Sequence, residues 1–376
     1  MKIRKLKILS AILLAILAMA VSYFCTNLNV SVSGERDVLK YWNAFISILS
    51  NKSDGTIPDN VLFIDVSSDK QLVDRTDEIG RPIGNAAITD RQKLAEMLDL
   101  IKEAGNYEYV LLDVFFEDGF ETAYDSILFN RIVTMDRIVI PQHKDGILAS
   151  PLLEEKAAYS DYTTTLKEDN FTKYPLLDKQ GNLSIPLRMY SDMTGRTIKR
   201  AGLLYLDRHS LSRRVVFPKM YLLNATYRYL GASLLDYRDV IDWNSFLKDK
   251  IIVFGSFIDD DIHLTYAGDV PGCVINYNVV MSLMRGQHRI PIGLIIAYFL
   301  IFFFMSLLLL SGESDINQSW AWIWAKLFVL YSVILTLVCI LVFTIWGQAH
   351  DVLLTSTFFS VVDTCHRWVI NRKKNA

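Results

Sequence analysis

The apolar residues of this chain gather into a few long runs near its two ends. Residues 8–34 carry no charge, residues 290–312 form a second uncharged run, and residues 320–346 form a third with Lys326 as its single charge. A helix needs about 20 residues, at about 1.5 Å each, to cross the roughly 30 Å hydrocarbon layer of a membrane. Because a helix of a water-soluble protein usually keeps a polar face, the second and third runs predict transmembrane helices rather than buried core helices.

The first run allows two interpretations. Basic residues within positions 2–7 precede it, and Ala18-Met19-Ala20 resembles the cleavage site of a secretory signal peptide. The uncharged stretch is longer than the apolar part of a usual signal peptide, which favours an uncleaved anchor. We therefore predict that residues 1–29 form a short cytoplasmic tail and the first transmembrane helix.

A fourth segment, residues 352–370, is a weaker candidate because its apolar part, VLLTSTFFSVV, has only 11 residues. Basic residues cluster at both ends of the chain, in MKIRKLK and in NRKKNA. The positive-inside rule then places both ends in the cytoplasm, which requires an even number of crossings. We predict that residues 352–370 cross the membrane and that residues 371–376 form a cytoplasmic tail. The alternative is three crossings, with this segment lying at the membrane interface.

Residues 30–288 lie between the first two predicted transmembrane helices and should form one domain outside the cytoplasm. Short apolar runs alternate there with segments of helical periodicity, around a less regular stretch at 143–215. Alternating strands and helices are typical of parallel crossovers, so we predict an α/β domain with a mixed, largely parallel sheet and flanking helices. The predicted strands are 60–66, 109–116, 137–141 and 250–257, with weaker ones at 185–190 and 201–206; the predicted helices are 37–49, 122–135, 219–230 and 274–285, with one more from an N-cap at Thr89 to Gly105.

Charge and cysteine content narrow the range of functions. The chain has 39 Lys and Arg against 41 Asp and Glu, a net charge of −2, so it lacks the concentrated positive charge of a nucleic-acid-binding protein. Its four cysteines form neither a disulfide framework nor a pair with zinc-ligand spacing, and its six histidines are scattered. The sequence has no glycine-rich phosphate loop and no recognised catalytic motif. We therefore expect no cofactor and no enzyme activity.

Four polar residues mark the best candidate site. Asp65 and Asp113 each lie at or near the end of a predicted strand, and Asp261 and His263 follow the last strand, where residues 259–261 are all acidic. The carboxyl ends of parallel strands share one edge of a sheet, and ligands bind in the crevice outside it. Converging carboxylates there could hold Ca²⁺ or another cationic ligand. The alternative is that each acid caps its own turn or helix.

The order of these segments resembles a known family. The stretches VLFIDV, VLLDVFFED, RIVIP, KIIVFGSF and DIHLTYAGDVPGCVINYNVVMSLMRG occur in the order typical of the CHASE2 domain. The resemblance implies an extracytoplasmic sensory module of bacterial receptors, held in the cytoplasmic membrane between one N-terminal and usually three C-terminal helices. It implies no particular ligand and no catalytic residue. Thr265-Tyr266 and Asn276-Tyr277-Asn278 depart from the family pattern, which usually has Thr-Pro and His-Ala-Asn there.

Two functions fit these features. The first is a multi-pass membrane sensor that perceives an envelope signal and relays it through its helices. Only six residues follow Ile370, so we expect the signal to pass to a separate signalling or envelope protein, or through self-association in the lipid bilayer. The second is a scaffolding protein whose outer domain binds an envelope protein or polymer. A transporter is disfavoured because Lys326 and Asp363 can both reach the membrane interface, and a hydrolase because no nucleophile and base have a recognised spacing.

The predicted topology can be tested by cysteine labelling. A cysteine introduced at Lys374 should resist a membrane-impermeant maleimide in intact cells and should react once the membrane is permeabilised. Native Cys273, in the predicted outer domain, is the probe for the opposite side if it is exposed. Labelling of position 374 from outside would contradict the fourth crossing.

Overall fold

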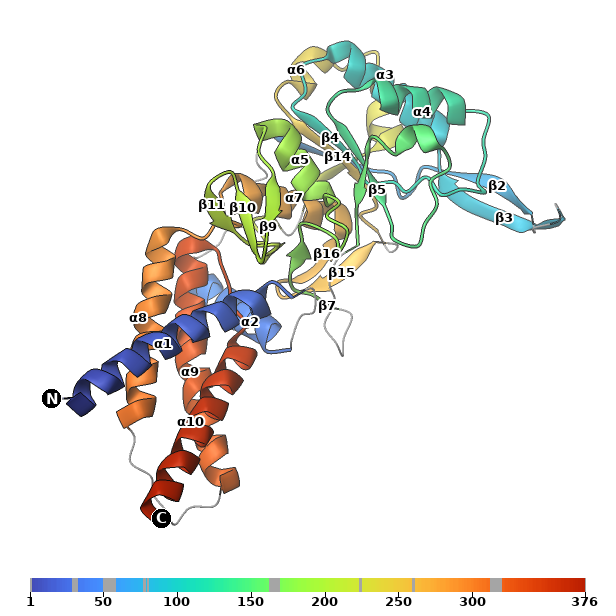
Figure 1. Ribbon diagram of the computed structural model, residues 1–376. Helices are drawn as coiled ribbons and strands as arrows, with labels where there is room; N and C mark the ends of the chain where they lie inside the picture. The colour runs from blue at the N-terminus through green and yellow to red at the C-terminus, as the bar shows by residue number, and fades with distance from the viewer. Residues whose placement is uncertain are drawn as a thin grey trace.

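The computed structural model places an α/β domain at one end of the molecule and a group of long helices at the other (Figure 1). Both chain termini lie on the side of the long helices that is away from the α/β domain. The structure describes residues 2–28, 33–49, 59–76, 79, 81–161, 170–222, 225–258, 261–311 and 320–375.

A six-stranded sheet forms the centre of the α/β domain. All neighbouring strands in it are parallel. The predicted α/β fold with a largely parallel sheet is therefore confirmed. Across the sheet, the strands are β13 (Tyr227–Tyr229), β1 (Val61–Asp65), β14 (Ile251–Gly255), β4 (Tyr109–Leu112), β5 (Ile138–Gln142) and β6 (Ala157–Tyr159).

The central strands are uninterrupted apolar sequences because both faces of the sheet are covered. Every residue of β1 and of β14 is buried. Successive side chains of a strand point to opposite faces. Leu62 and Ile64 accordingly join one hydrophobic cluster, whereas Phe63 joins the other.

Helices from different parts of the chain cover the two faces. One face packs against α3 (Arg91–Ala104) and α4 (Asp125–Thr134), and the other against α5 (Ile185–Thr194) and α7 (Gly272–Met284). The chain passes from β1 and β4 to helices on the first face, but from β14 to α7 on the second. β14 and β4 are neighbours in the sheet, so a crevice opens between their carboxyl ends, as it does at the switch point of other open α/β sheets.

Two local predictions were wrong at the start of a helix: one helix was read as a strand, and another was given the wrong capping residue. Residues 185–190 do not form a strand but begin α5, which has Pro186 in its first turn and ends at Gly195 with a left-handed φ of 64°. Thr89 does not cap α3. It ends a strand, and Asp90 caps the helix by accepting hydrogen bonds from the backbone N–H groups of Gln92 and Lys93.

The predicted helix at 219–230 was also wrong. Its last residues form β13, which pairs with the edge of β1, and a π-helical turn over Leu230–Leu234 follows. The Gly231 backbone N–H donates to the buried Asp69 carboxylate at 3.1 Å, which ties this turn to the sheet. Residues 223–224 lie outside the described part of the chain.

Small sheets surround the central one. In place of the single strand predicted at 201–206, a hairpin turns at Gly202, whose φ is 64°. A two-stranded arm that the sequence did not predict projects from the domain (Figure 1). The arm is β2 (Lys70–Thr76) and β3 (Pro82–Thr89); the other elements are β7 (Asn170–Phe171), β8 (Tyr174–Pro175), β9 (Ile198–Ala201), β10 (Leu204–Asp207), β11 (Ser210–Ser212), β12 (Val215–Val216), β15 (Ile262–Thr265), β16 (Gly268–Pro271) and the short helix α6 (Trp243–Leu247).

Three stretches of the described helices are long and apolar enough to cross a membrane: Lys5–Thr26, Ile292–Leu310 and Val329–Trp346. A further helix covers the segment 352–370, whose crossing stays a prediction. The long helices are α1 (Lys2–Thr26), α2 (Ser33–Leu49), α8 (Ile292–Ser311), α9 (Trp320–Trp346) and α10 (Val352–Asn375). In this group α1 packs against α8 and α10, and α9 packs against α10 and α2.

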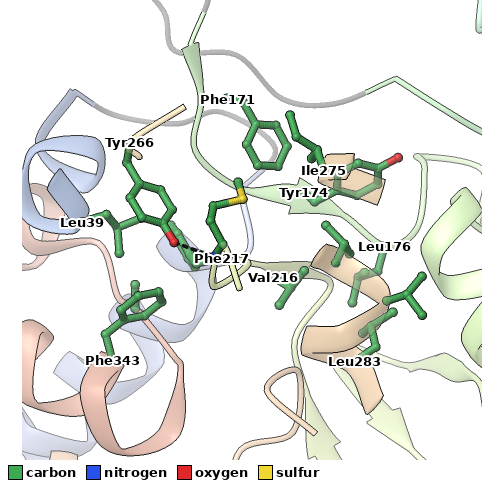
Figure 2. Packing of buried hydrophobic residues seen from close by; sticks show 14 of the residues in the cluster. Leu39, Phe171, Tyr174, Leu176, Val216, Phe217, Tyr266, Ile275, Leu283 and Phe343 are labelled. Carbon is green, nitrogen blue, oxygen red and sulfur yellow. Dashed lines mark hydrogen bonds between the residues drawn. The ribbon is translucent and has the colours of Figure 1, made fainter. Parts of the chain in front are cut away.

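One apolar core runs from the sheet into the long helices. Ile275 of α7 and Phe217, which follows β12, belong to the same buried cluster as Leu39 of α2 and Phe343 of α9 (Figure 2). Tyr266 lies between these groups in Figure 2. The α/β domain and the helices are therefore not joined by a flexible linker alone but share packed side chains.

The buried state of Cys273 changes the labelling experiment. Its side chain has no exposed surface, so it cannot report the outer side of the membrane. A cysteine at Ile147, which is 70% exposed in the same domain, is a suitable replacement.

The close contact between α7 and β14 can be tested by filling it. A Cβ atom at Gly255 would lie 2.5 Å from the Cβ of Cys273. We expect Gly255→Ala to lower the Tm of the full chain, because overpacking a core costs about 1–3 kcal/mol and each kcal/mol shifts Tm by roughly 2–4 °C in a domain of about 150–250 residues. Gly293→Ala in α8 is the matched control, since no heavy atom lies within 4 Å of its added Cβ. Equal Tm values for the two variants would contradict the close packing.

Candidate functional site

A cavity of about 370 Å³ lies at the carboxyl ends of the central strands. It is bounded by the segments after β14, β4, β5 and β6, by β15 and by the first turns of α7. This volume is within the range of small-molecule sites, and the location is where open α/β sheets bind ligands. The side chains that line it include Asp113, His143, Asp161, Asp261, His263 and Asn276.

Asp113 follows β4 and is tied to α7. Asn276 Nδ2 donates to Asp113 Oδ2 at 3.0 Å, and the Tyr174 hydroxyl donates to Asn276 Oδ1 at 2.8 Å. The tyrosine thereby fixes which side of the amide faces Asp113. Burial, and then the nearby Asp261 carboxylate, raise the pKa of Asp113 to about 7, although the Asn276 hydrogen bond and His263 oppose the shift.

Asp261 and His263 occupy the side of the cavity where α7 begins. His263 Nε2 lies 2.8 Å from Asp261 Oδ1, and the Gly272 backbone N–H donates to the Asp261 carbonyl at 2.8 Å. A Cβ atom at position 272 would overlap the Asp261 carboxylate, so a larger residue there would have to displace that side chain. The start of α7 and Asp261 must therefore move together.

A second acid–histidine pair, which the sequence did not single out, lines the same cavity. His143 Nδ1 lies 3.0 Å from Asp161 Oδ1, and the Lys144 backbone N–H donates to Asp161 Oδ2 at 3.1 Å. The Phe115 ring packs edge-on against the His143 ring at 4.9 Å. His143 follows β5, which was predicted, so the position of strand ends could have pointed to it. Asp161 follows β6, which was not predicted. The interpretation of residues 143–215 as irregular concealed it.

Asp65 is the one predicted site residue that lies elsewhere. Its buried carboxylate accepts hydrogen bonds from the backbone N–H of Ser67 at 2.9 Å, from the Ser67 hydroxyl at 2.8 Å and from the Phe257 N–H at 3.3 Å. It therefore caps the turn after β1. The structure brings together Asp113, Asp261 and His263 around the cavity and leaves Asp65 outside it.

The cavity acids do not gather as metal ligands do. Within the residues that the structure describes, no group of three or more His, Cys, Asp or Glu side chains is arranged to hold a metal ion. Each cavity acid instead has its own protein partner. Residues 259–260, which precede Asp261, lie outside the described part of the chain.

The model of the CHASE2 domain matches residues 36–311 of this chain, from α2 to the end of α8. The chain belongs to the CHASE2 domain family. No curated protein and no solved structure matched it. CHASE2 domains are extracytoplasmic sensory domains, and the apolar helices of this chain are those of a membrane protein. The CHASE2 match includes both the cavity and α8, so the sensory module comprises the site and the apolar helix that follows it.

The raised pKa of Asp113 predicts how stability depends on pH. The folded CHASE2 domain holds a proton on Asp113 between the ordinary pKa of 3.8 and about 7, where the unfolded chain has lost it, so this residue lowers stability as pH rises through that window. We expect Asp113→Asn to raise Tm relative to the unmodified chain, and by more at about pH 8 than at about pH 5. Thermal unfolding of the full chain at both pH values measures the difference. A difference independent of pH would contradict the shifted pKa.

Proposed function

We propose that this protein is a multi-pass sensor of the bacterial cytoplasmic membrane, with residues 30–288 outside and both ends inside. A small envelope molecule enters the cavity, and the change is relayed through the helices to a separate partner protein. Residues 352–370 form the fourth crossing. The observation that carries this proposal is the position of α7, which begins at the cavity and ends just before α8.

α7 offers a direct mechanical connection. Its first turns carry Gly272 and Asn276, which contact Asp261 and Asp113 of the cavity. Its last residue is Met284, and the linker 285–291 leads into α8. A ligand that changes the position of Asp113 or Asp261 would displace this helix, because its first turns contact both residues.

The linker between α7 and α8 is held to the domain by contacts with the buried carboxylate of Asp207. His288 Nε2 lies 3.0 Å from Asp207 Oδ2, and Arg289 Nε donates to the same oxygen at 2.5 Å. His288 has no exposed surface, and burial lowers its pKa to about 4 despite the nearby Asp207 carboxylate. A neutral, fully packed His288 makes the linker a stiff connection rather than a hinge.

A second connection runs through the loop 347–351 between α9 and α10. Every residue of this loop is buried. Its carbonyl at Ala349 accepts a hydrogen bond from Arg213 Nη1 of the domain, and Gln348 Nε2 donates to the Arg289 carbonyl of the linker. The loop therefore contacts the domain and the linker at once, so a shift of either one would reach α9 and α10.

The same loop ends in a buried charge. Asp351 and Lys173, which precedes β8, are both completely buried. Burial raises the pKa of Asp351, and the Lys173 ammonium opposes this shift, so the two groups lie close enough to influence each other. Because a buried charge is costly without compensation, this attraction supports a fixed coupling between the domain and α10.

Photocrosslinking tests the relay. A photoreactive phenylalanine at Trp368, which is 51% exposed near the end of α10, should capture one specific protein in living cells. Asp113→Asn removes the charge of the cavity acid, as charge compensation by a ligand would, and should change the yield of this adduct by roughly twofold or more. Asp239→Asn is the matched control, since Asp239 lies on the exposed surface away from the cavity.

The outcomes separate the two functions. A protein adduct whose yield is the same with Asp113→Asn would support the scaffolding function instead of a sensor. The absence of any protein adduct would contradict a separate partner. The same photoreactive residue at Leu341 on α9, which is 57% exposed, should capture lipid and not the protein.

A further inference from the structure

We infer that the cavity binds a small organic cation, such as a molecule with a protonated amine or a quaternary ammonium group, held by Asp113, Asp161 and Asp261. This inference names the ligand class of the sensor site proposed above. It rests on the charge of the cavity lining, on how the acids are spaced and on the electrostatics of Asp113.

The described lining of the cavity is predominantly acidic. It contains the three carboxylates of Asp113, Asp161 and Asp261 and the imidazoles of two histidines, and no Lys or Arg side chain is among its described residues. The basic side chains of this edge of the domain, Lys144, Lys179 and Arg188, line a neighbouring depression instead. A negative potential in a partly enclosed site attracts cations and excludes anions.

The spacing of the acids favours an organic cation over a metal ion. A divalent metal needs several oxygen or nitrogen ligands around one point, and the described residues form no such group. Each carboxylate is instead bonded to its own neighbour: Asp261 to His263, Asp161 to His143, and Asp113 to Asn276. Acids distributed around a space of about 370 Å³ suit a ligand with several atoms.

Asp113 provides the energetic reason for binding. In the described part of the chain, the Asn276 amide is the side chain that donates to its carboxylate, and the Asp261 carboxylate repels its charge. A cation placed beside both acids would offset that repulsion. Two aromatic rings, Phe115 and Tyr174, also line the cavity, and ring faces stabilise cations, quaternary ammonium groups above all.

The location of the cavity is a separate reason, independent of the charge of its lining, to expect a ligand there. The chain leaves β14 and β4 toward opposite faces of the sheet, and Ser256 and Asp113, directly after these strands, both line the cavity. Crevices at such switch points are where open α/β sheets bind small molecules. Capping of separate turns would not by itself place these acids around one crevice.

Matched compounds of equal size test the inference. Putrescine, 1,4-butanediol and succinate share a four-carbon chain and differ in charge, and choline differs from neutral 3,3-dimethyl-1-butanol in the same way. With the full chain in detergent at about pH 8, we expect at least one of the two cations to raise Tm with increasing concentration, as binding to the folded state requires. The neutral compounds and succinate should give no shift.

Site variants and a titration with calcium complete the experiment. Asp113→Asn and Asp161→Asn should each weaken binding of the active cation roughly tenfold or more by calorimetry, whereas Asp239→Asn should leave it unchanged. Equal binding of the neutral compounds, no shift with either cation, or a shift with CaCl₂ alone that Asp113→Asn removes would each overturn the inference. The crosslinking response to Asp113→Asn does not depend on these compounds, so the sensor proposal stands or fails separately.

Discussion

The close approach of α7 to β14 at Gly255 is the constraint on which the site depends. Cys273 packs directly on this glycine, which leaves no room for any other side chain. The first turns of α7 are thereby held at the ends of the central strands, with Asn276 3.0 Å from Asp113 and Gly272 against Asp261. A helix held farther from the sheet would separate these groups. The same helix leads to α8, so one packing contact determines both the wall of the cavity and the start of the connection to the apolar helices.

Polar groups buried where the domain meets the helices impose a second constraint. Lys173 and Asp351 are completely buried, and Arg213 donates to the loop 347–351 from the domain. A buried polar group that loses its partner costs about 1–3 kcal/mol. Apolar side chains can slide past one another at small cost, but these hydrogen bonds have few alternative arrangements. The domain and the helix ends are therefore expected to move as connected parts.

The acid Asp113 in the cavity lowers the stability of the folded protein. Asp113 is partly buried beside Asp261, and both effects disfavour its ionised form. A protein selected for stability alone would have an apolar or amide side chain at this position. Sites that break the local rules for stability are commonly functional ones. Asp65, by contrast, is the last residue of β1 and has three hydrogen bonds to its carboxylate, so it contributes to the turn and not to the cavity.

Patterns within the sequence determined the apolar helices and the central strands. Long uncharged runs require a membrane. Short apolar runs such as VLFID and IIVFG require a sheet that is covered on both faces. Because the carboxyl ends of parallel strands share one edge of a sheet, the sequence also predicted that Asp113 and Asp261 lie at the same edge. Only the tertiary structure decided that Asp65 turns away and that His143 and Asp161 join the cavity. It also decided that residues 227–229 pair with β1. Local periodicity records which residues are buried, but the order of strands and the direction of a side chain at a strand end depend on contacts between residues far apart in the chain.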